Sequence, residues 1–144
     1  MDIIERYYRE SDREWLWDLY ESSLKPYIEE QWGWDEDYQT NGFFNKLPIN
    51  QFKIVSLGGS DVAAYLLLEE IDHVYVKMML VAEGFRNIGV GRHLMSNICA
   101  NAADLGLPVR LSVINCNPAI SLYKRLGFVA TSVDDGSTYM SYGE

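Results

Sequence analysis

One stretch of the sequence decides the fold: residues 81–94, Val81-Ala82-Glu83-Gly84-Phe85-Arg86-Asn87-Ile88-Gly89-Val90-Gly91-Arg92-His93-Leu94. An apolar strand ends here in a glycine turn that passes directly into a helix. Gly89 and Gly91 remove side chains where the backbone must approach a ligand, and the free N–H groups of the first helical turn lie at the positive end of the helix dipole. Because such a turn binds phosphate or pyrophosphate, and Arg86 and Arg92 add positive charge, we predict an anion-binding site here.

The spacing within this turn excludes several common motifs. No Gly-Lys-Ser/Thr follows, so the Walker A pattern fails, and Leu94 stands where the dinucleotide fingerprint has glycine or alanine. The GxSxG elbow of esterases is also absent. What remains is Arg-x-x-Gly-x-Gly after an apolar strand. A short glycine pair can also serve only as a tight turn, and this alternative stays open on these residues alone.

The hydrophobic pattern changes period on both sides of the turn, between the alternation of strands and the wider spacing of helices. The sequence predicts an α/β (α+β) fold, with a mixed, mainly antiparallel sheet flanked by helices in the order βααβββαβαββ. The expected strands are residues 2–9, 51–57, 62–70, 74–82, 109–114, 128–133 and 138–142. The expected helices are residues 11–23, broken off by Pro26, and residues 27–45, 89–105 and 118–126.

The size and composition of the chain are those of one compact domain, expected over residues 1–144. It weighs 16.5 kDa, with 48% hydrophobic and 23% charged residues. Cys99 and Cys116 form neither a CxxC pair nor a disulfide-rich pattern, and the two histidines lie apart, so we expect no metal site. No apolar signal region or stretch of about 20 apolar residues is present, and we expect a cytoplasmic protein that does not bind membranes.

The net charge of −9 is concentrated near the N-terminus. Residues 1–40 hold 12 acidic and 4 basic side chains, whereas residues 41–144 hold 9 and 8. Nucleic acids and anionic membranes are bound by clusters of lysine and arginine, which are lacking here, so we expect neither as a partner. The acidic region either keeps the protein soluble or attracts a cationic partner, and the charge pattern alone leaves both open.

A second motif follows at residues 117–128, Asn117-Pro118-Ala119-Ile120-Ser121-Leu122-Tyr123-Lys124-Arg125-Leu126-Gly127-Phe128. Together with the glycine turn, it resembles the GNAT acetyltransferase superfamily. Members bind acetyl-CoA through an Arg/Gln-x-x-Gly-x-Gly/Ala turn and carry a later Asn-x-x-Ala-x-x-Leu-Tyr-x-x-Leu-Gly-Phe-like segment. Two linked motifs are more specific than one, and the resemblance is firm over residues 74–128.

The resemblance implies acetyl-CoA as the acyl-donor co-substrate. Its pyrophosphate would lie on the backbone amides of residues 87–92, and its pantetheine arm would pair with the backbone of residues 80–82. In the family this strand is bulged and separates from the next, leaving a cleft between residues 79–81 and 111–113. The implied cofactor-binding residues are Val81, Ala82, Arg86, Asn87, Ile88, Gly89, Val90, Gly91, Arg92, Asn117 and Tyr123.

The implied reaction is direct attack of a primary amine on the acetyl thioester. A backbone amide of Leu80 or Val81 resembles the oxyanion donor, and Tyr123 matches the general acid that protonates the leaving thiolate, since its phenol has an ordinary pKa of about 10. Tyr123 could instead only pack its helix against the sheet. Asn115 or Asn117 corresponds to the family asparagine, although the usual spacing of seven residues to the tyrosine falls on Cys116.

The general base and the acceptor site are less clearly marked. Some family members carry a glutamate near the position of Tyr75, and others near Leu111 or Ser112. His73 is a candidate base that shares one alternating face with Tyr75, Lys77, Met79 and Val81, and the alternative is a plain exposed histidine in a turn. Residues 27–38 mix aromatic rings with carboxylates, which favours a cationic acceptor, although the same residues could simply pack a core. The expected acceptor-binding residues are Glu29, Trp32, Trp34 and Tyr75.

The sequence therefore predicts an acetyl-CoA-dependent N-acetyltransferase acting on a small-molecule or peptide amine, without metal. Two rivals remain: a non-catalytic acyl-CoA sensor or a module that binds basic peptides, and an enzyme of the same fold that uses a longer acyl donor. We also expect that residues 138–142 could leave a free sheet edge for pairing in a homodimer.

Overall fold

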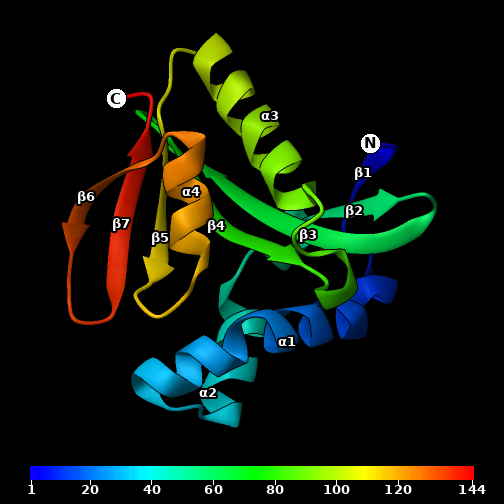
Figure 1. The fold of residues 1–144 in the computed structure, drawn as a ribbon. Helices are drawn as coiled ribbons and strands as arrows, with labels where there is room; N and C mark the ends of the chain where they lie inside the picture. The colour runs from blue at the N-terminus through cyan, green and yellow to red at the C-terminus, as the bar shows by residue number, and fades with distance from the viewer.

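A computed structural model describes all residues, 1–144, and contains one seven-stranded sheet in the order β1-β2-β3-β4-β5-β7-β6 (Figure 1). Neighbouring strands are antiparallel except β4 and β5, which are parallel. The predicted order of elements and the mixed, mainly antiparallel sheet are confirmed. The strands are β1 (Ile3–Tyr7), β2 (Lys53–Leu57), β3 (Ser60–Glu69), β4 (Val74–Val81), β5 (Val109–Ile114), β6 (Val129–Val133) and β7 (Ser137–Tyr142). The helices are α1 (Arg13–Trp32), α2 (Glu36–Asn41), α3 (Val90–Asp104) and α4 (Ala119–Leu126).

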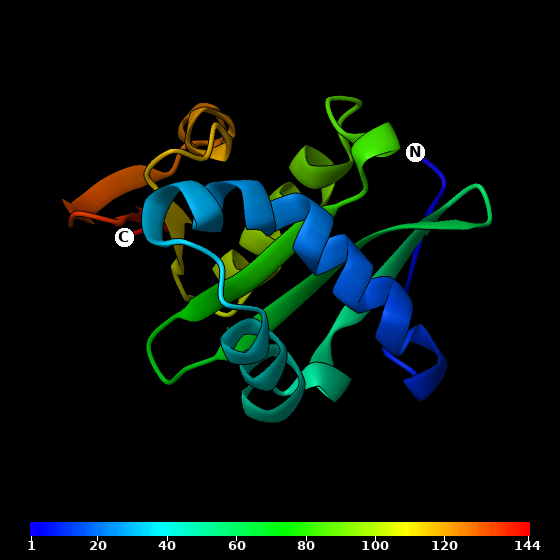
Figure 2. The same cartoon turned by 90° about the horizontal axis from the view of Figure 1, so that it is seen from below.

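The helices form two layers with separate hydrophobic cores (Figures 1 and 2). One core lies under α3 and α4 and includes Leu94 and Leu111, and the other lies under α1 and includes Leu16 and Leu80. The sheet is therefore covered on both faces, with α1 on the face opposite α3. None of the helices combines the length and apolar character needed to cross a bilayer.

Helix α1 continues through Pro26, so the expected break at this residue is wrong. A proline inside a helix costs about 3 kcal/mol because it cannot donate to the carbonyl four residues earlier. Four side chains of α1 are buried, three before Pro26 and Ile28 after it. Each contributes about 1.5–3 kcal/mol, so packing on the sheet outweighs the lost hydrogen bond. The helix ends instead at Gly33, where φ is 84°, and the second expected helix shrinks to α2 and one π-helical turn at Gly42–Lys46.

A bulge at Lys77 reverses the side-chain alternation of β4. Leu66 of β3 pairs with Met78, but the next residue, Leu67, pairs with Val76, so Lys77 is the extra residue. Before the bulge Val76 packs in the core under α3, and after it Met79 and Val81 pack on that side. The expected common face for His73, Tyr75, Lys77, Met79 and Val81 is therefore wrong, because one inserted residue moves the later side chains to the other face.

Strands β4 and β5 pair over only two positions, Val74 with Val109 and Tyr75 with Arg110, and then diverge (Figure 1). The gap expected between these strands is thus present. At the far end of the sheet, β7 lies between β5 and β6, so the free edge expected at residues 138–142 is wrong. The edge strand on this side is β6, and any pairing across this edge would involve residues 129–133.

Candidate functional site

A cavity of about 550 Å³ lies where β4 and β5 diverge, between α1, the glycine turn, the start of α3, and α4. Its 18 lining residues include three arginines, Arg86, Arg92 and Arg125, and no carboxylate. In a chain with 21 acidic and 12 basic side chains, this composition is a strong local exception. We call this cavity the basic groove.

The glycine turn forms one wall of the basic groove and begins α3. Asn87 and Gly89 have positive φ angles of 62° and 96°, and α3 starts at Val90 directly after them. A Cβ atom built on Gly91 would lie 3.7 Å from the Val81 side chain, an ordinary contact, so the absence of a side chain here is not required by internal packing. The glycine instead leaves the backbone of the first helical turn accessible from the groove, where its N–H groups can donate to an anion.

The predicted residues of this turn divide into two groups. The side chains of Asn87 and Arg92 line the groove together with Gly89 and Gly91. Ile88 is half exposed to solvent and Val90 is buried in the core, and neither side chain lines the groove. These two residues can contribute only their backbone amides.

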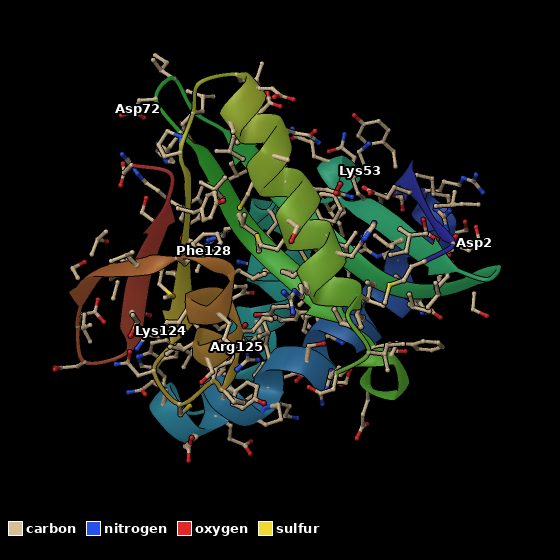
Figure 3. The ribbon with its side chains drawn as sticks, turned by 45° about the horizontal axis from the view of Figure 1, so that its top comes forward. Asp2, Lys53, Asp72, Lys124, Arg125 and Phe128 are labelled. Atoms are coloured by element: carbon tan, nitrogen blue, oxygen red, sulfur yellow. The ribbon has the colours of Figure 1, made fainter.

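The three arginines of the groove are held differently. Arg86 donates from Nε to the Val81 carbonyl at 2.8 Å and from Nη2 to Ser23 Oγ at 3.2 Å, so it ties the end of β4 to α1. Arg92 and Arg125 make no hydrogen bond or ion pair within the protein. Figure 3 shows Arg125 and Lys124 leaving α4 in different directions, and of the two only Arg125 lines the groove. Two guanidinium groups are thus free to bind an anion, and Arg125 was missed because it lies in the second motif and not in the turn.

The backbone of β4 presents alternate residues to the gap. The Ala82 N–H donates to the Val62 carbonyl of β3 at 2.8 Å. Given the antiparallel register of β3 and β4, the amides of Leu80 and Ala82 therefore point to β3, while those of Met79 and Val81 point to the gap. The side chain of Leu80 is buried under α1. Of the two amides considered from the sequence, the alternation favours Val81, and it adds the Met79 amide, whose direction depends on how β3 and β4 pair.

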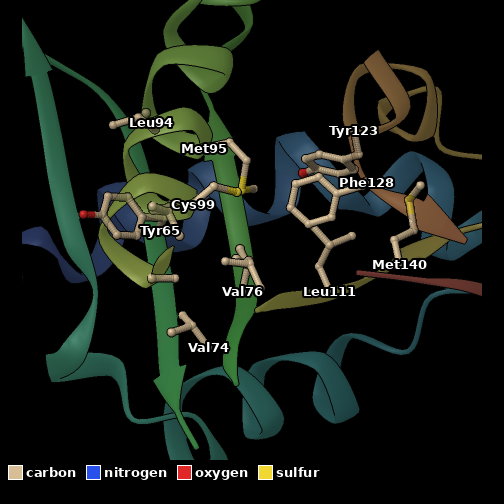
Figure 4. Packing of buried hydrophobic residues seen from close by; sticks show 14 of the residues in the cluster. Tyr65, Val74, Val76, Leu94, Met95, Cys99, Leu111, Tyr123, Phe128 and Met140 are labelled. Atoms are coloured by element: carbon tan, nitrogen blue, oxygen red, sulfur yellow. The ribbon is translucent and has the colours of Figure 1, made fainter. Parts of the chain in front are cut away.

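Tyr123 of α4 lines the groove from the side opposite the glycine turn. It is 9% exposed, its ring packs 5.8 Å from that of Phe128, and its hydroxyl has no hydrogen-bond partner in the protein (Figure 4). Burial raises the pKa of this phenol to about 12. Tyr123 therefore presents a neutral O–H donor to the groove at physiological pH.

The structure separates the two candidate asparagines. Asn117 lines the groove, and its Oδ1 accepts from the Ala119 N–H at 2.9 Å at the start of α4. Asn115 does not line it, because its amide binds the Asp134 carbonyl and the Thr138 hydroxyl. Cys116, at the usual family spacing, donates from Sγ to the Tyr27 carbonyl at 3.5 Å. Interaction with the Glu30 carboxylate raises the pKa of its thiol, so an activated nucleophile is not expected here.

On the face of the sheet opposite α3 and α4, Tyr75 and Ser112 mark the point where β4 and β5 diverge. Tyr75 belongs to the last backbone pair, with Arg110, and Ser112 lies two residues further along β5; their hydroxyl oxygens are 3.1 Å apart. His73 directly precedes β4, on the side of Tyr75 where β4 and β5 are paired, and its Nδ1 contacts Asp72 at 2.7 Å and Arg110 at 3.3 Å. Tyr75 is thus placed beside the gap, whereas His73 is engaged away from it.

The structure does not bring the other expected acceptor residues into the groove. Trp34 packs in an aromatic cluster, 6.2 Å from the ring of Trp17, and its Nε1 donates to Glu36 at 2.6 Å. Glu29 lies in a separate hollow on the outer side of α1, and Trp32 packs on the turn between β6 and β7. No group of three or more His, Cys, Asp or Glu side chains is arranged to hold a metal ion.

Comparisons with known proteins agree with this arrangement. Residues 7–128 match the model of the acetyltransferase (GNAT) family. The fold is similar to PaiA N-acetyltransferase from Thermoplasma acidophilum, solved in complex with coenzyme A, with a TM-score of 0.80, 16% identity, and 99% of each chain covered. It is also similar to Ard1 from Thermoplasma volcanium, with a TM-score of 0.70, 22% identity, and 99% of this chain and 97% of that chain covered.

A third similar structure is Naa50 from Arabidopsis thaliana in complex with the bisubstrate analogue CoA-Ac-MVNAL, with a TM-score of 0.69, 18% identity, and 98% of each chain covered. No curated protein sequence matches the chain. At these identities the solved structures show a shared fold, while the family model spans most of the sequence. The chain belongs to the acetyltransferase (GNAT) family.

Proposed function

We infer that this acetyltransferase moves an acetyl group from acetyl-CoA to a primary amine of a small molecule or peptide. The single observation that carries this proposal is the basic groove, which gathers three arginines and no carboxylate beside an open helix N-terminus. A phosphorylated ligand would otherwise meet repulsion from a chain of net charge −9. The solved complex of PaiA N-acetyltransferase with coenzyme A supports the choice of ligand.

In this proposal, the pyrophosphate of acetyl-CoA lies on the backbone amides of residues 87–92, with Arg92 and Arg125 supplying charge. The pantetheine arm lies along the gap-facing backbone of β4, where the Val81 N–H is free to pair with it. The Val81 carbonyl already accepts from Arg86. The side chain of Asn117 lies on the same wall as Tyr123 and is available to the ligand.

The proposed chemistry is a direct transfer. The amine nitrogen attacks the thioester carbonyl carbon, a C–N bond forms and the C–S bond breaks. A gap-facing amide, from Met79 or Val81, donates to the developing oxyanion. Tyr123 gives its proton to the departing sulfur, and the nitrogen loses its extra proton to water. Tyr123 suits this role because its hydroxyl is protonated, buried and without a partner in the protein.

The acceptor is proposed to approach over the face of the sheet opposite α3 and α4, past Tyr75. This route keeps amine and acetyl-CoA on separate sides of the gap between β4 and β5, so that they meet at the thioester. Glu29 and Trp32 would act at the rim of this route, by charge and by shape. Trp34 would support it only through packing.

Titration calorimetry with acetyl-CoA, followed by thiol release over a panel of amines, tests this proposal. We expect binding at micromolar to submillimolar concentration and thiol release that depends on the amine. Absence of binding at millimolar acetyl-CoA would refute the proposed function. Lys25→Gln, on the outer side of α1, is a matched control whose acetyl-CoA binding should be unchanged, because Lys25 lies over the Trp34 ring, outside the groove.

A second candidate function is a non-catalytic acyl-CoA sensor. It is favoured by one observation: the side chains beside the gap on the acceptor face are hydroxyls of Tyr75 and Ser112, and His73 is engaged elsewhere. An amine that is partly neutral at physiological pH needs no dedicated base, so the enzyme remains the preferred proposal. Binding of acetyl-CoA without thiol release for any amine would select the sensor.

A further inference from the structure

The hydroxyl of Tyr123 has no hydrogen-bond partner in the protein, so the packing of its ring alone decides where this hydroxyl lies in the basic groove. Tyr123 is also the one buried residue of α4, a helix of eight residues, so its ring is the main anchor of α4 on the core. A general acid must lie within hydrogen-bond reach of the atom that it protonates. The packing around the Tyr123 ring therefore bears directly on the proposed chemistry.

The ring of Tyr123 packs on the ring of Phe128, which follows α4 in the chain. The two ring centroids lie 5.8 Å apart with the ring planes at 60°, the edge-to-face arrangement that aromatic pairs favour. The Phe128 N–H also donates to the Tyr123 carbonyl at 3.0 Å. Phe128 is 3% exposed, and Figure 4 shows it between Tyr123 and Leu111 of β5. Phe128 therefore connects the Tyr123 ring to the sheet.

A third ring, that of Tyr142 at the end of β7, contacts both residues that join α4 to β6. Its centroid lies 5.5 Å from that of Phe128, with the ring planes at 44°. A Cβ atom built on Gly127 would lie 3.0 Å from Cε2 of Tyr142, so this ring rests on the backbone where α4 ends. Gly127 has a φ of 107°, the left-handed conformation that closes many helices. We call Gly127, Phe128 and Tyr142 the Tyr123 support.

The position of Tyr142 is fixed by β7, which pairs with β5 on one side and with β6 on the other. Tyr142 itself pairs with the buried Val109 of β5. It does not line the basic groove, so it can act on a bound ligand only through its neighbours. Because β5 is one of the two strands that border the gap, the support joins the Tyr123 ring to the sheet beside the proposed reaction site.

We propose that Tyr142 is a positioning residue for proton donation by Tyr123. This role rests on the proposed acetyl transfer and adds to it a residue outside both sequence motifs. The Tyr142 ring holds Phe128 and the end of α4 in place, and thereby holds the Tyr123 hydroxyl where the sulfur of acetyl-CoA departs. Without this ring, Phe128 and α4 can relax into the vacated space, and a displacement of about 1 Å at a reacting group can lower the rate about 100-fold. The proposed contacts of the pyrophosphate and the pantetheine arm lie mainly on the glycine turn and β4, so acetyl-CoA affinity should change little.

The test measures whether Tyr142 acts through the Tyr123 hydroxyl. Tyr142→Ala and Tyr142→Phe are each made in the wild type and in Tyr123→Phe, with kcat taken from thiol release and acetyl-CoA affinity from calorimetry. In the wild type, Tyr142→Ala should lower kcat about tenfold or more and change the acetyl-CoA Kd less than about twofold. Tyr142→Phe keeps the ring and should retain kcat. In Tyr123→Phe, Tyr142→Ala should lower the residual kcat no further, because the hydroxyl that it misplaces is gone.

Leu57→Ala is the matched control, because Leu57 on β2 is partly buried against the same core and lies outside the Tyr123 support. It should lower the stability toward urea without lowering kcat. If Tyr142→Ala unfolds the protein, Tyr142→Leu, which fills more of the space without a ring, takes its place in the same comparison.

The possible failures are distinguishable. An unchanged kcat in Tyr142→Ala, or an equal loss of kcat in both backgrounds, would overturn the role of Tyr142 and leave acetyl transfer intact. Wild-type turnover in Tyr123→Phe would overturn it as well, again without touching acetyl transfer. Acetyl-CoA binding without thiol release for any amine, or no binding at all, would overturn the proposed function and the role of Tyr142 with it.

Discussion

The two sides of helix α1 carry opposite electrostatic environments. Toward the basic groove it contributes Ser23, Leu24 and Tyr27, which are uncharged, and the groove itself contains arginines and no carboxylate. On its outer side, one hollow is lined by Asp18, Glu21, Ser22, Lys25, Pro26 and Glu29. A single helix thus separates the region proposed for an anionic donor from the acidic region near the proposed acceptor route.

The net charge of the whole chain therefore does not predict the charge of the site. Screening limits the influence of exposed charges to about 8–10 Å at ordinary ionic strength, so local arginines can dominate the groove in an acidic protein. If this separation serves catalysis, each side of α1 should act only on its own substrate.

The largest effect is expected at Tyr123, where the two substrates would meet. Tyr123→Phe keeps the ring against Phe128 and removes the hydroxyl that lines the groove. Loss of a general acid lowers turnover by about 100-fold or more. Acetyl-CoA affinity, measured by calorimetry, should be nearly unchanged. A variant with wild-type turnover would remove Tyr123 from the mechanism.

The pH dependence of turnover gives a separate check on the same residue. Burial raises the pKa of Tyr123 to about 12, so the proton needed for the sulfur remains bound through neutral and moderately alkaline pH. Deprotonation of this group should therefore cause no loss of kcat between pH 7 and about 10. A falling limb in this range that disappears in Tyr123→Phe would contradict the pKa direction.

The next largest effect is expected for the arginines of the basic groove. Arg92→Gln and Arg125→Gln each remove a guanidinium that has no partner in the protein and lines the groove. Each should weaken acetyl-CoA binding about tenfold, since a charge-assisted hydrogen bond to phosphate is lost, with a smaller difference at high salt. The acceptor KM should stay near the wild-type value. A change confined to the acceptor would contradict the assignment of the groove.

Some parts of the fold and of the site could be predicted from the sequence, and others could not. The glycine turn was recognisable because its requirements are local: a strand, two glycines and a helix start within fourteen residues. The bounds of β5 agree with the predicted strand for the same reason, since Val109, Leu111 and Val113 alternate without interruption. Local pattern and final structure coincide where no distant contact competes.

The sequence predictions are wrong where contacts between residues far apart in the chain determine the structure. Pro26 is tolerated because α1 is held on the sheet along its length, and the bulge at Lys77 depends on how β3 and β4 pair. Trp34 and Trp32 are equally aromatic in the sequence, yet one joins a cluster and the other packs on Gly136, 104 positions away. No periodicity within residues 27–38 contains that information.

A smaller effect tests whether acidic residues at the start of α2 are structural. Asp35 Oδ1 accepts from the Tyr38 N–H at 3.0 Å and caps α2. Asp35→Ala should lower the unfolding free energy by about 1 kcal/mol, as for other N-caps, without changing acetyl-CoA affinity. Asp37→Ala, in the same turn but without a capping bond, is the matched control. Urea unfolding measures both, and equal losses would show that the cap contributes nothing special.

The smallest effect concerns the acidic side itself, where attraction of the acceptor competes with simple solvation. Glu29→Gln with Glu30→Gln removes two exposed negative charges near the end of α1 and alters no ion pair. We expect the KM of a cationic amine to rise about threefold at low salt, because exposed charges contribute only fractions of a kcal/mol. The KM of acetyl-CoA should not rise, and Asp104→Asn at the far end of α3 should change neither. If the acceptor KM is unaffected at low salt, these carboxylates only solvate the helix, and the opposition between the two sides of α1 acts on the donor alone.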